Sequence, residues 1–217
     1  MNKLIYLARR NPGLSRERFV ARWRKHGALA MSLGLWRHMA GYVQASVLHP
    51  APIRGASVDY DAVGVLWYKD DALKDPVAAD APDMQVMAQD EPQTFSALVR
   101  PGSLVGEEEV LKTSGSGRST AYLFFNDVAE ARAAAEEATA SHATHRVAIT
   151  LAWPIAERGL PYRAVVDVSA EDVAGLKALF GADGLSQIGA ELAVVARDAV
   201  LWEDLESVLS DDRRGRD

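Results

Sequence analysis

Two different periods of hydrophobic and polar positions alternate along the first half of the chain. Residues 3–9 are mostly apolar and stop at the turn-forming segment 11–13, which predicts a short strand. Apolar residues then recur at steps of three and four after Ser15, which predicts an amphipathic helix capped by that serine. The apolar face of this helix holds Phe19, Val20, Trp23, His26, Gly27 and Ala30.

A period of two begins after residue 41. In the segment 42–48, Val43, Ala45 and Val47 alternate with more polar positions, which predicts a half-buried strand. The pattern predicts further strands at 60–68 and 95–100, with a short helix at 84–90 between them.

The same order of elements follows a Gly/Ser-rich segment, residues 113–118, which is typical of a flexible linker. One helix is predicted at 128–140, capped by Asn126 or Asp127, and a second at 170–180, capped by Ser169. The predicted strands are 121–125, 147–153, 162–168 and 192–202. The charged residues at the end of the chain are typical of a tail.

Each half therefore has the order strand, helix, strand, strand, helix, strand, which is the order of a ferredoxin-like α+β unit. Such a unit carries both helices on one face of its antiparallel sheet and leaves the other face uncovered. Two tandem units can cover each other, so we predict that the two sheets pack together or curl into one barrel within the chain. The predicted boundaries are 1–112 for the first unit, 113–118 for the linker, 119–205 for the second unit and 206–217 for the tail.

The composition of the chain excludes several kinds of binding partner and of functional site. With 24 Lys and Arg against 30 Asp and Glu, the formal charge is −6, and the lack of a basic block argues against nucleic acid or an anionic membrane as partner. The chain has no cysteine, which excludes disulfides, Cys-ligated metals and thiol nucleophiles. Neither a signal peptide nor a membrane span of about 20 apolar residues is evident. We therefore expect a cytoplasmic protein.

His26 is the most informative single residue. It follows Phe19 by seven residues and Trp23 by three, so it shares the helix face that packs against the protein. An imidazole has an unperturbed pKa of about 6.5 and can act as acid or base at neutral pH. The alternative is a core histidine that is hydrogen-bonded to the backbone.

The segment SRERFVARWRKHGALAMSLGLWRHMAGYVQ resembles the EthD family of the dimeric α/β-barrel superfamily. The resemblance covers residues 3 to about 112, and residues 119–205 match the family only in the order of elements. It rests on Phe19, Trp23, His26, the run Tyr42-Val43-Gln44, Tyr60-Asp61, Leu66-Trp67 and a closing segment with Asp90, Glu91 and Phe95. It implies a barrel of two ferredoxin-like units with a cavity for apolar or aromatic small molecules. Relatives include polyketide cyclases, decarboxylases, muconolactone isomerases, cofactor-free monooxygenases and haem-binding enzymes, so the fold does not choose the reaction.

The resemblance also implies roles for particular residues. His26, Tyr42 and Asp61 are the expected catalytic residues, with Tyr42 or Asp61 within hydrogen-bonding reach of the His26 ring. The expected substrate-binding residues are Phe19, Trp23, Gln44 and Trp67. Many relatives carry an acidic residue within the third strand, where this chain has Val65. This departure argues against a carboxylate-assisted or metal-assisted mechanism.

Other chemistry-bearing patterns are weak. His142 and His145 are three residues apart, which suits two metal ligands on one helix face, but no third ligand is nearby and an exposed helix end is favoured. Residues 107–109, three glutamates, are typical of a solvated run. Phosphate-binding, hydrolase and zinc-protease motifs are absent from the sequence. We therefore expect neither a cofactor nor a metal, and the lack of Cys and of a His cluster disfavours haem.

Two functions are compatible with these residues. In the first, an enzyme holds an apolar or aromatic substrate in a cavity of the first half, and His26 moves a proton during cyclisation, decarboxylation, isomerisation or elimination. In the second, a ligand-binding or accessory protein of a degradative or biosynthetic pathway holds such a molecule without turning it over. The helix 128–140 lacks the aromatic face of the first helix, so we expect a chiefly structural second half. A homodimer through the remaining sheet edges is compatible with the sequence.

Overall fold

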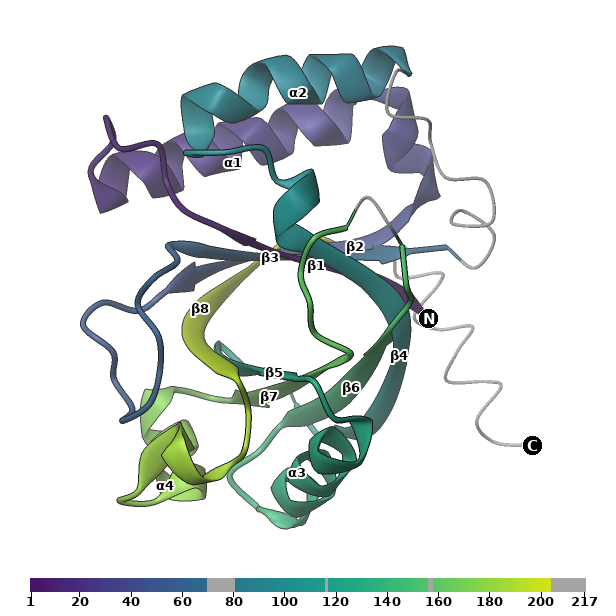
Figure 1. Ribbon diagram of the computed structural model, residues 1–217. Coiled ribbons are helices and arrows are strands. Elements are labelled where there is room, and N and C mark those ends of the chain that lie inside the picture. The colour runs from purple at the N-terminus through teal and green to yellow at the C-terminus, as the bar shows by residue number, and fades with distance from the viewer. Residues whose placement is uncertain (70–80, 116, 156–157, 204–217) are drawn as a thin grey trace.

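A closed barrel of eight strands forms the centre of the computed structural model (Figure 1). The structure describes residues 1–69, 81–115, 117–155 and 158–203. The strands are β1 (Asn2–Ala8), β2 (Met39–Val47), β3 (Ala62–Tyr68), β4 (Ser103–Thr113), β5 (Ser119–Phe125), β6 (Arg146–Ala152), β7 (Ala164–Ala170) and β8 (Leu192–Glu203). The α-helices are α1 (Arg16–Ser32), α2 (Pro82–Thr94), α3 (Val128–Ala140) and α4 (Val173–Phe180). Short 3-10 helices are η1 (Gly34–His38), η2 (Arg100–Gly102) and η3 (Gly184–Gln187).

The barrel consists of two ferredoxin-like sheets joined edge to edge. Its strand order is β1-β3-β2-β8-β5-β7-β6-β4, so each half contributes four neighbouring strands. The halves meet where β2 pairs antiparallel with β8 and where β4 pairs antiparallel with β6. The predicted fold class is therefore confirmed, in the form of one barrel. Each described strand has a neighbour on both sides, so no whole strand of the barrel is left as a free edge.

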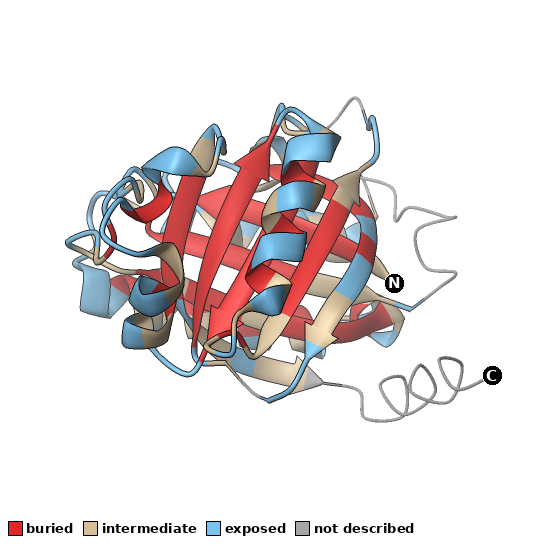
Figure 2. Cartoon of the chain, turned by 90° about the horizontal axis from the view of Figure 1, so that it is seen from below, coloured by how far each residue is buried: buried red, intermediate tan, exposed pale blue. Residues whose placement is uncertain are grey.

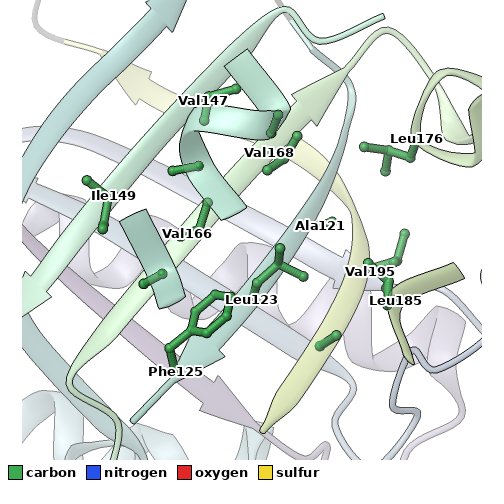
Figure 3. Packing of buried hydrophobic residues seen from close by; sticks show 14 of the residues in the cluster. Ala121, Leu123, Phe125, Val147, Ile149, Val166, Val168, Leu176, Leu185 and Val195 are labelled. Carbon is green, nitrogen blue, oxygen red and sulfur yellow. The ribbon is translucent and has the colours of Figure 1, made fainter. Parts of the chain in front are cut away.

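Side chains of the strands alternate between the barrel interior and two outer helix layers. The interior cluster combines residues of both halves, among them Ile5, Val65, Phe124 and Val165. Helices α1 and α2 lie side by side over the first half, while α3 and α4 cover the second half on the opposite side (Figure 1). Under α3 the strands are buried along most of their length (Figure 2). Figure 3 shows the outer-layer core of this half, where Leu123 packs with residues of β6 and β7.

Several helix boundaries follow from the capping residues. The Ser15 side chain accepts a hydrogen bond from the Arg18 N–H and starts α1, as predicted. Asp127 caps α3 in the same way, accepting from two backbone N–H groups. The prediction that Ser169 caps the second helix of this half is wrong. Ser169 belongs to β7, and Asp172 caps α4.

The fourth strand is the main error in the predicted elements. Residue Phe95 forms only an isolated bridge with Arg10, and β4 begins at Ser103 instead. The glutamate run 107–109 therefore lies within a strand. Strand alternation turns Glu108 into the barrel, where it is buried, while Glu107 and Glu109 remain exposed. A run of like charges therefore does not exclude a strand, because the inward glutamate pairs with the cations Lys3 and Arg146.

Candidate functional site

His26 and Asp90 form a hydrogen-bonded pair between α1 and α2. The His26 ring is 5% exposed, and its Nδ1 lies 2.7 Å from Asp90 Oδ2. Asp90 also forms an ion pair with Arg22, which lies one helical turn before His26 on α1. His26 also makes an edge-on contact with Phe95, with ring centroids 5.2 Å apart. The ring is therefore held in one orientation by a carboxylate and an aromatic side chain.

The electrostatics of this pair favour a neutral imidazole beside an ionised carboxylate. Burial lowers the pKa of His26, and the hydrogen bond that His26 donates to Asp90 opposes this shift only in part. Burial would raise the pKa of Asp90, but Arg22 and His26 outweigh it and lower that pKa. Because an ionised carboxylate only accepts hydrogen bonds, the Nδ1 of His26 carries the proton. The lone pair is then on Nε2, which has no hydrogen-bond partner within the part of the chain that the structure describes.

The partner of His26 differs from the two that the sequence indicates. Neither Tyr42 nor Asp61 is hydrogen-bonded to the imidazole, and Asp90 takes that place. The sequence resemblance includes Asp90 only as part of a closing segment. Its pairing with His26 depends on how α2 lies along α1, and residue spacing does not encode that arrangement.

Tyr42 and Gln44 belong to a buried hydrogen-bond network between α1 and the outer face of the sheet. The Gln44 Nε2 donates to Tyr42 Oη at 2.8 Å and to the Trp23 carbonyl at 2.9 Å. The Trp23 Nε1 donates to Tyr6 Oη at 3.0 Å, and the two tyrosine hydroxyls are 3.3 Å apart. Burial raises the pKa of Tyr42, so its hydroxyl stays protonated at neutral pH.

Aromatic side chains fill the same layer. Phe19 stacks on Trp23 with ring centroids 5.6 Å apart, and the two residues are 1% and 0% exposed. A substrate reaches these rings only if the helix layer opens. The role of Phe19, Trp23 and Gln44 in substrate binding stays a prediction.

Asp61 lies in a different environment. Its carboxylate accepts hydrogen bonds from the Arg10 guanidinium at 2.9 and 3.1 Å and from the Arg10 backbone N–H at 3.0 Å. Arg16 approaches the same carboxylate at 3.5 Å. Among the described residues, Asp61 and His26 share no polar partner, so the three predicted catalytic residues do not form one cluster.

Trp67 faces the barrel interior, where it meets a buried ion-pair network. Its Nε1 donates to Glu108 Oε2 at 2.7 Å. The Lys3 Nζ lies 2.8 Å from Glu108 Oε1 and 2.6 Å from Asp167 Oδ1, and Arg146 pairs with the same two carboxylates. Burial would raise the pKa of Glu108, but the two cations outweigh it and lower the pKa to about 2. Two cations and two anions therefore neutralise each other inside the barrel.

A fifth charged group of the interior, Asp198, is not neutralised in this way. Thr120 and Tyr122 donate hydrogen bonds to its carboxylate, and burial raises its pKa to about 6. In the unfolded chain this carboxyl has a pKa of about 3.9. The folded state therefore binds the proton more tightly, and the free energy of unfolding falls as the pH rises from about 4 to 6.

We expect Asp198→Asn to raise the free energy of unfolding at pH 7.5 by roughly 1–2 kcal/mol, because it removes a poorly solvated charge and keeps polar atoms for both hydroxyls. At pH 4, where the native carboxyl is protonated, the difference should disappear. Urea unfolding at the two pH values measures both quantities. A variant that is less stable than the native protein by the same amount at both pH values would show that shape, not charge, matters at this position.

The larger of two cavities that we describe lies in the second half, which contradicts the expectation that the first half holds it. Its volume is about 580 Å³, and it lies between α3 and the end of α4, over Leu123 of β5 and Val168 of β7. In the first half, α1 and α2 lie side by side (Figure 1). Aromatic rings fill the layer below them. In the second half the helices are apart, and α3 presents Ala133, Ala134 and Ala138. Small side chains therefore leave space where large ones would close it.

The remaining histidine pair does not lie on one helix face. Helix α3 ends at Ala140, and His142 is exposed in the turn that follows it. Among the described residues, no group of three or more His, Asp or Glu side chains is arranged to hold a metal ion. In the same residues no helix has the length and apolar character that crossing a membrane requires.

The barrel with its outer helix layers has the dimeric α/β-barrel fold, formed here within one chain. Neither a protein-family model nor a curated protein matches the chain. Membership of the EthD family therefore stays a prediction.

Solved structures nevertheless share the fold over most of the chain. A candidate monooxygenase from Fusobacterium nucleatum has a TM-score of 0.52 at 9% identity, covering 93% of this chain and 91% of that one. A protein described as anthrone oxidase-like has a TM-score of 0.57 at 8% identity and covers 93% of each chain. A candidate chlorite dismutase has a TM-score of 0.53 at 10% identity, covering 91% of this chain and 94% of that one. All three are named after enzymes, and identities this low show the shared fold alone.

Proposed function

We propose that this protein is a small-molecule enzyme in which His26 takes a proton from an apolar or aromatic substrate and Asp90 orients the imidazole. The observation that carries the proposal is the 2.7 Å hydrogen bond between Nδ1 of a buried His26 and Asp90. It directs the Nε2 lone pair away from Asp90, and the lowered pKa of His26 keeps that lone pair free at neutral pH.

The residues around the pair have complementary roles. Asp90 stabilises the tautomer of His26 that carries its proton on Nδ1, and Arg22 keeps Asp90 in place by an ion pair. Carboxylates next to catalytic histidines act in the same way. When Nε2 takes a proton from a carbon that is conjugated with a carbonyl, directly or through an aromatic ring, the C–H electron pair forms a new C=C bond. The π electron pair of the carbonyl moves to its oxygen, and an enolate forms. The imidazolium that results is stabilised by the ionised Asp90. Isomerisation, cyclisation and elimination can each begin with this step.

Anthrone is a suitable first probe, because it is an apolar aromatic ketone with an acidic CH₂ group and one fold neighbour is named after its oxidation. The experiment follows exchange of this CH₂ group with solvent deuterium by mass spectrometry, under argon so that oxidation does not consume the ketone. We expect the protein to accelerate exchange above the buffer rate at pH 7.5. Saturable binding of anthrone without any acceleration would contradict the enzymatic proposal for this substrate class and support a binding protein.

A second candidate function is the binding of an apolar ligand without turnover, and the cavity of the second half favours it. Its volume of about 580 Å³ is within the range of small-molecule pockets. Leu179, Phe180 and Ile188 supply apolar walls opposite the alanines of α3. A ligand in this cavity would lie on the other side of the barrel from His26.

We expect Ala134→Phe to weaken binding of the neutral fluorescent probe Nile red by at least tenfold in affinity, because the new ring occupies the cavity between α3 and α4. The matched control is Ala129→Phe, which adds the same ring on the exposed side of α3. Fluorescence titration measures both variants. Equal binding by the two would show that the probe binds elsewhere.

A further inference from the structure

We propose that the arginine pocket around Asp61 binds the carboxylate group of a small apolar acid. This pocket has a volume of about 340 Å³ and lies where the turn between β1 and α1 meets the segment before β3. The residues that line it are Arg9, Arg10, Pro12, Arg16, Val58, Asp59, Asp61 and Ser96.

Asp61 positions the guanidinium groups of this pocket. Its carboxylate is 8% exposed and binds the Arg10 side chain at 2.9 and 3.1 Å and the Arg16 Nε at 3.5 Å. Arg16 Nη2 lies 3.0 Å from Nδ1 of His49, which gives that side chain a second contact. Arg9 donates from Nε to the Asp59 carbonyl at 2.7 Å and lies over the Tyr60 ring at 5.0 Å. Each guanidinium is thus ordered before any ligand arrives.

The pocket retains positive charge and hydrogen-bond donors after these contacts. Three arginines line it against two aspartates, a net charge of +1 in a protein whose formal charge is −6. Each of the three guanidinium groups keeps at least one Nη atom that has no acceptor among the described residues. Ordered guanidinium groups with unused N–H donors match a carboxylate. A monoanion would neutralise the remaining charge.

The rim of the pocket indicates the rest of the ligand. Val58 is 45% exposed, and Pro12, another exposed residue, also lines the pocket, so the guanidinium groups share the pocket with apolar side chains that face solvent. The aromatic or aliphatic part of a small acid can cover both Val58 and Pro12. This site is separate from the His26 pair, so the inference does not depend on the proposed function.

Benzoate is the probe that fits this description, and isothermal titration calorimetry at constant ionic strength measures its binding. We expect saturable binding of one benzoate per chain, which becomes about tenfold weaker in Arg16→Gln and in Arg9→Gln, because each loses a charge-assisted donor. Arg18→Gln is the matched control, since it removes the same charge from an exposed position of α1 outside the pocket. Benzyl alcohol, the neutral analogue, should not bind, and thermal unfolding of each variant verifies that it is folded.

Several outcomes would overturn the inference. They are the absence of saturable benzoate binding, equal weakening by Arg18→Gln, and saturable binding of inorganic phosphate in place of benzoate. Loss of benzoate binding in His26→Gln with retention in Arg16→Gln would locate the acid at the other site. Retained binding in His26→Gln keeps the two proposals distinct.

Discussion

Replacing Lys3 by methionine should lower the free energy of unfolding by about 3–5 kcal/mol, because it leaves buried carboxylates without one of their two cations. The Lys3 side chain is 0% exposed and contacts both Glu108 and Asp167. Methionine keeps the apolar stem and loses only the ammonium group, so the packing of the barrel interior changes little. Arg146 alone cannot neutralise both carboxylates, and the pKa of Glu108, about 2 in the native protein, should rise.

Two comparisons distinguish charge from packing in this experiment. Lys25→Met removes an ammonium group from an exposed position of α1 and should have little effect. The double variant Lys3→Met/Glu108→Gln restores neutrality and should be more stable than Lys3→Met alone. Urea unfolding of the three variants measures the differences. A loss for Lys3→Met no larger than that for Lys25→Met would contradict the account of the barrel interior.

The sequence contains enough local information to predict most of the elements. The boundaries of α3 at 128 and 140 and the cap Ser15 follow from side chains that act within one helical turn. The order of strands and helices in each half limits the topology to ferredoxin-like units, and an uncovered sheet face requires a partner. These two facts lead to two sheets that pack together or curl into one barrel, and the structure shows the barrel.

The errors concern contacts between residues that are distant in the sequence. Glu108 resembles a surface residue until Lys3 and Arg146, from two other strands, come to lie beside it. Asp90 becomes the partner of His26 only when α2 packs along α1. The local sequence around Glu108 or Asp90 contains no pattern that predicts these long-range contacts.

Part of the candidate site could be predicted, because it depends on spacing within one helix. The helical spacing of His26 and Trp23 correctly predicts that both face the protein, where they are 5% and 0% exposed. The position of the larger cavity was not predictable, because it depends on the short α4 lying apart from α3. Empty space results from the sizes and positions of many side chains together.

Replacing His26 by glutamine should slow the exchange of anthrone by roughly two to four orders of magnitude, the usual effect of losing a positioned general base. Glutamine is similar in size and can still hydrogen-bond to Asp90, so α1 and α2 should keep their packing. Asp90→Asn should lower the rate by a smaller factor, because the imidazole remains but loses the carboxylate that orients it and stabilises its protonated form. His142→Gln, at an exposed position beyond α3, is the matched control and should exchange at the native rate.

The deuterium exchange rate of anthrone in His26→Gln, measured beside its unfolding free energy, tests the central claim most directly. The proposal predicts a rate reduced toward that of buffer in a variant that remains folded and still binds the ketone. If His26 is instead a core histidine, the variant should lose about 1–3 kcal/mol of stability through its altered hydrogen bonding. A native exchange rate in the destabilised variant would contradict the assignment of His26 as the base.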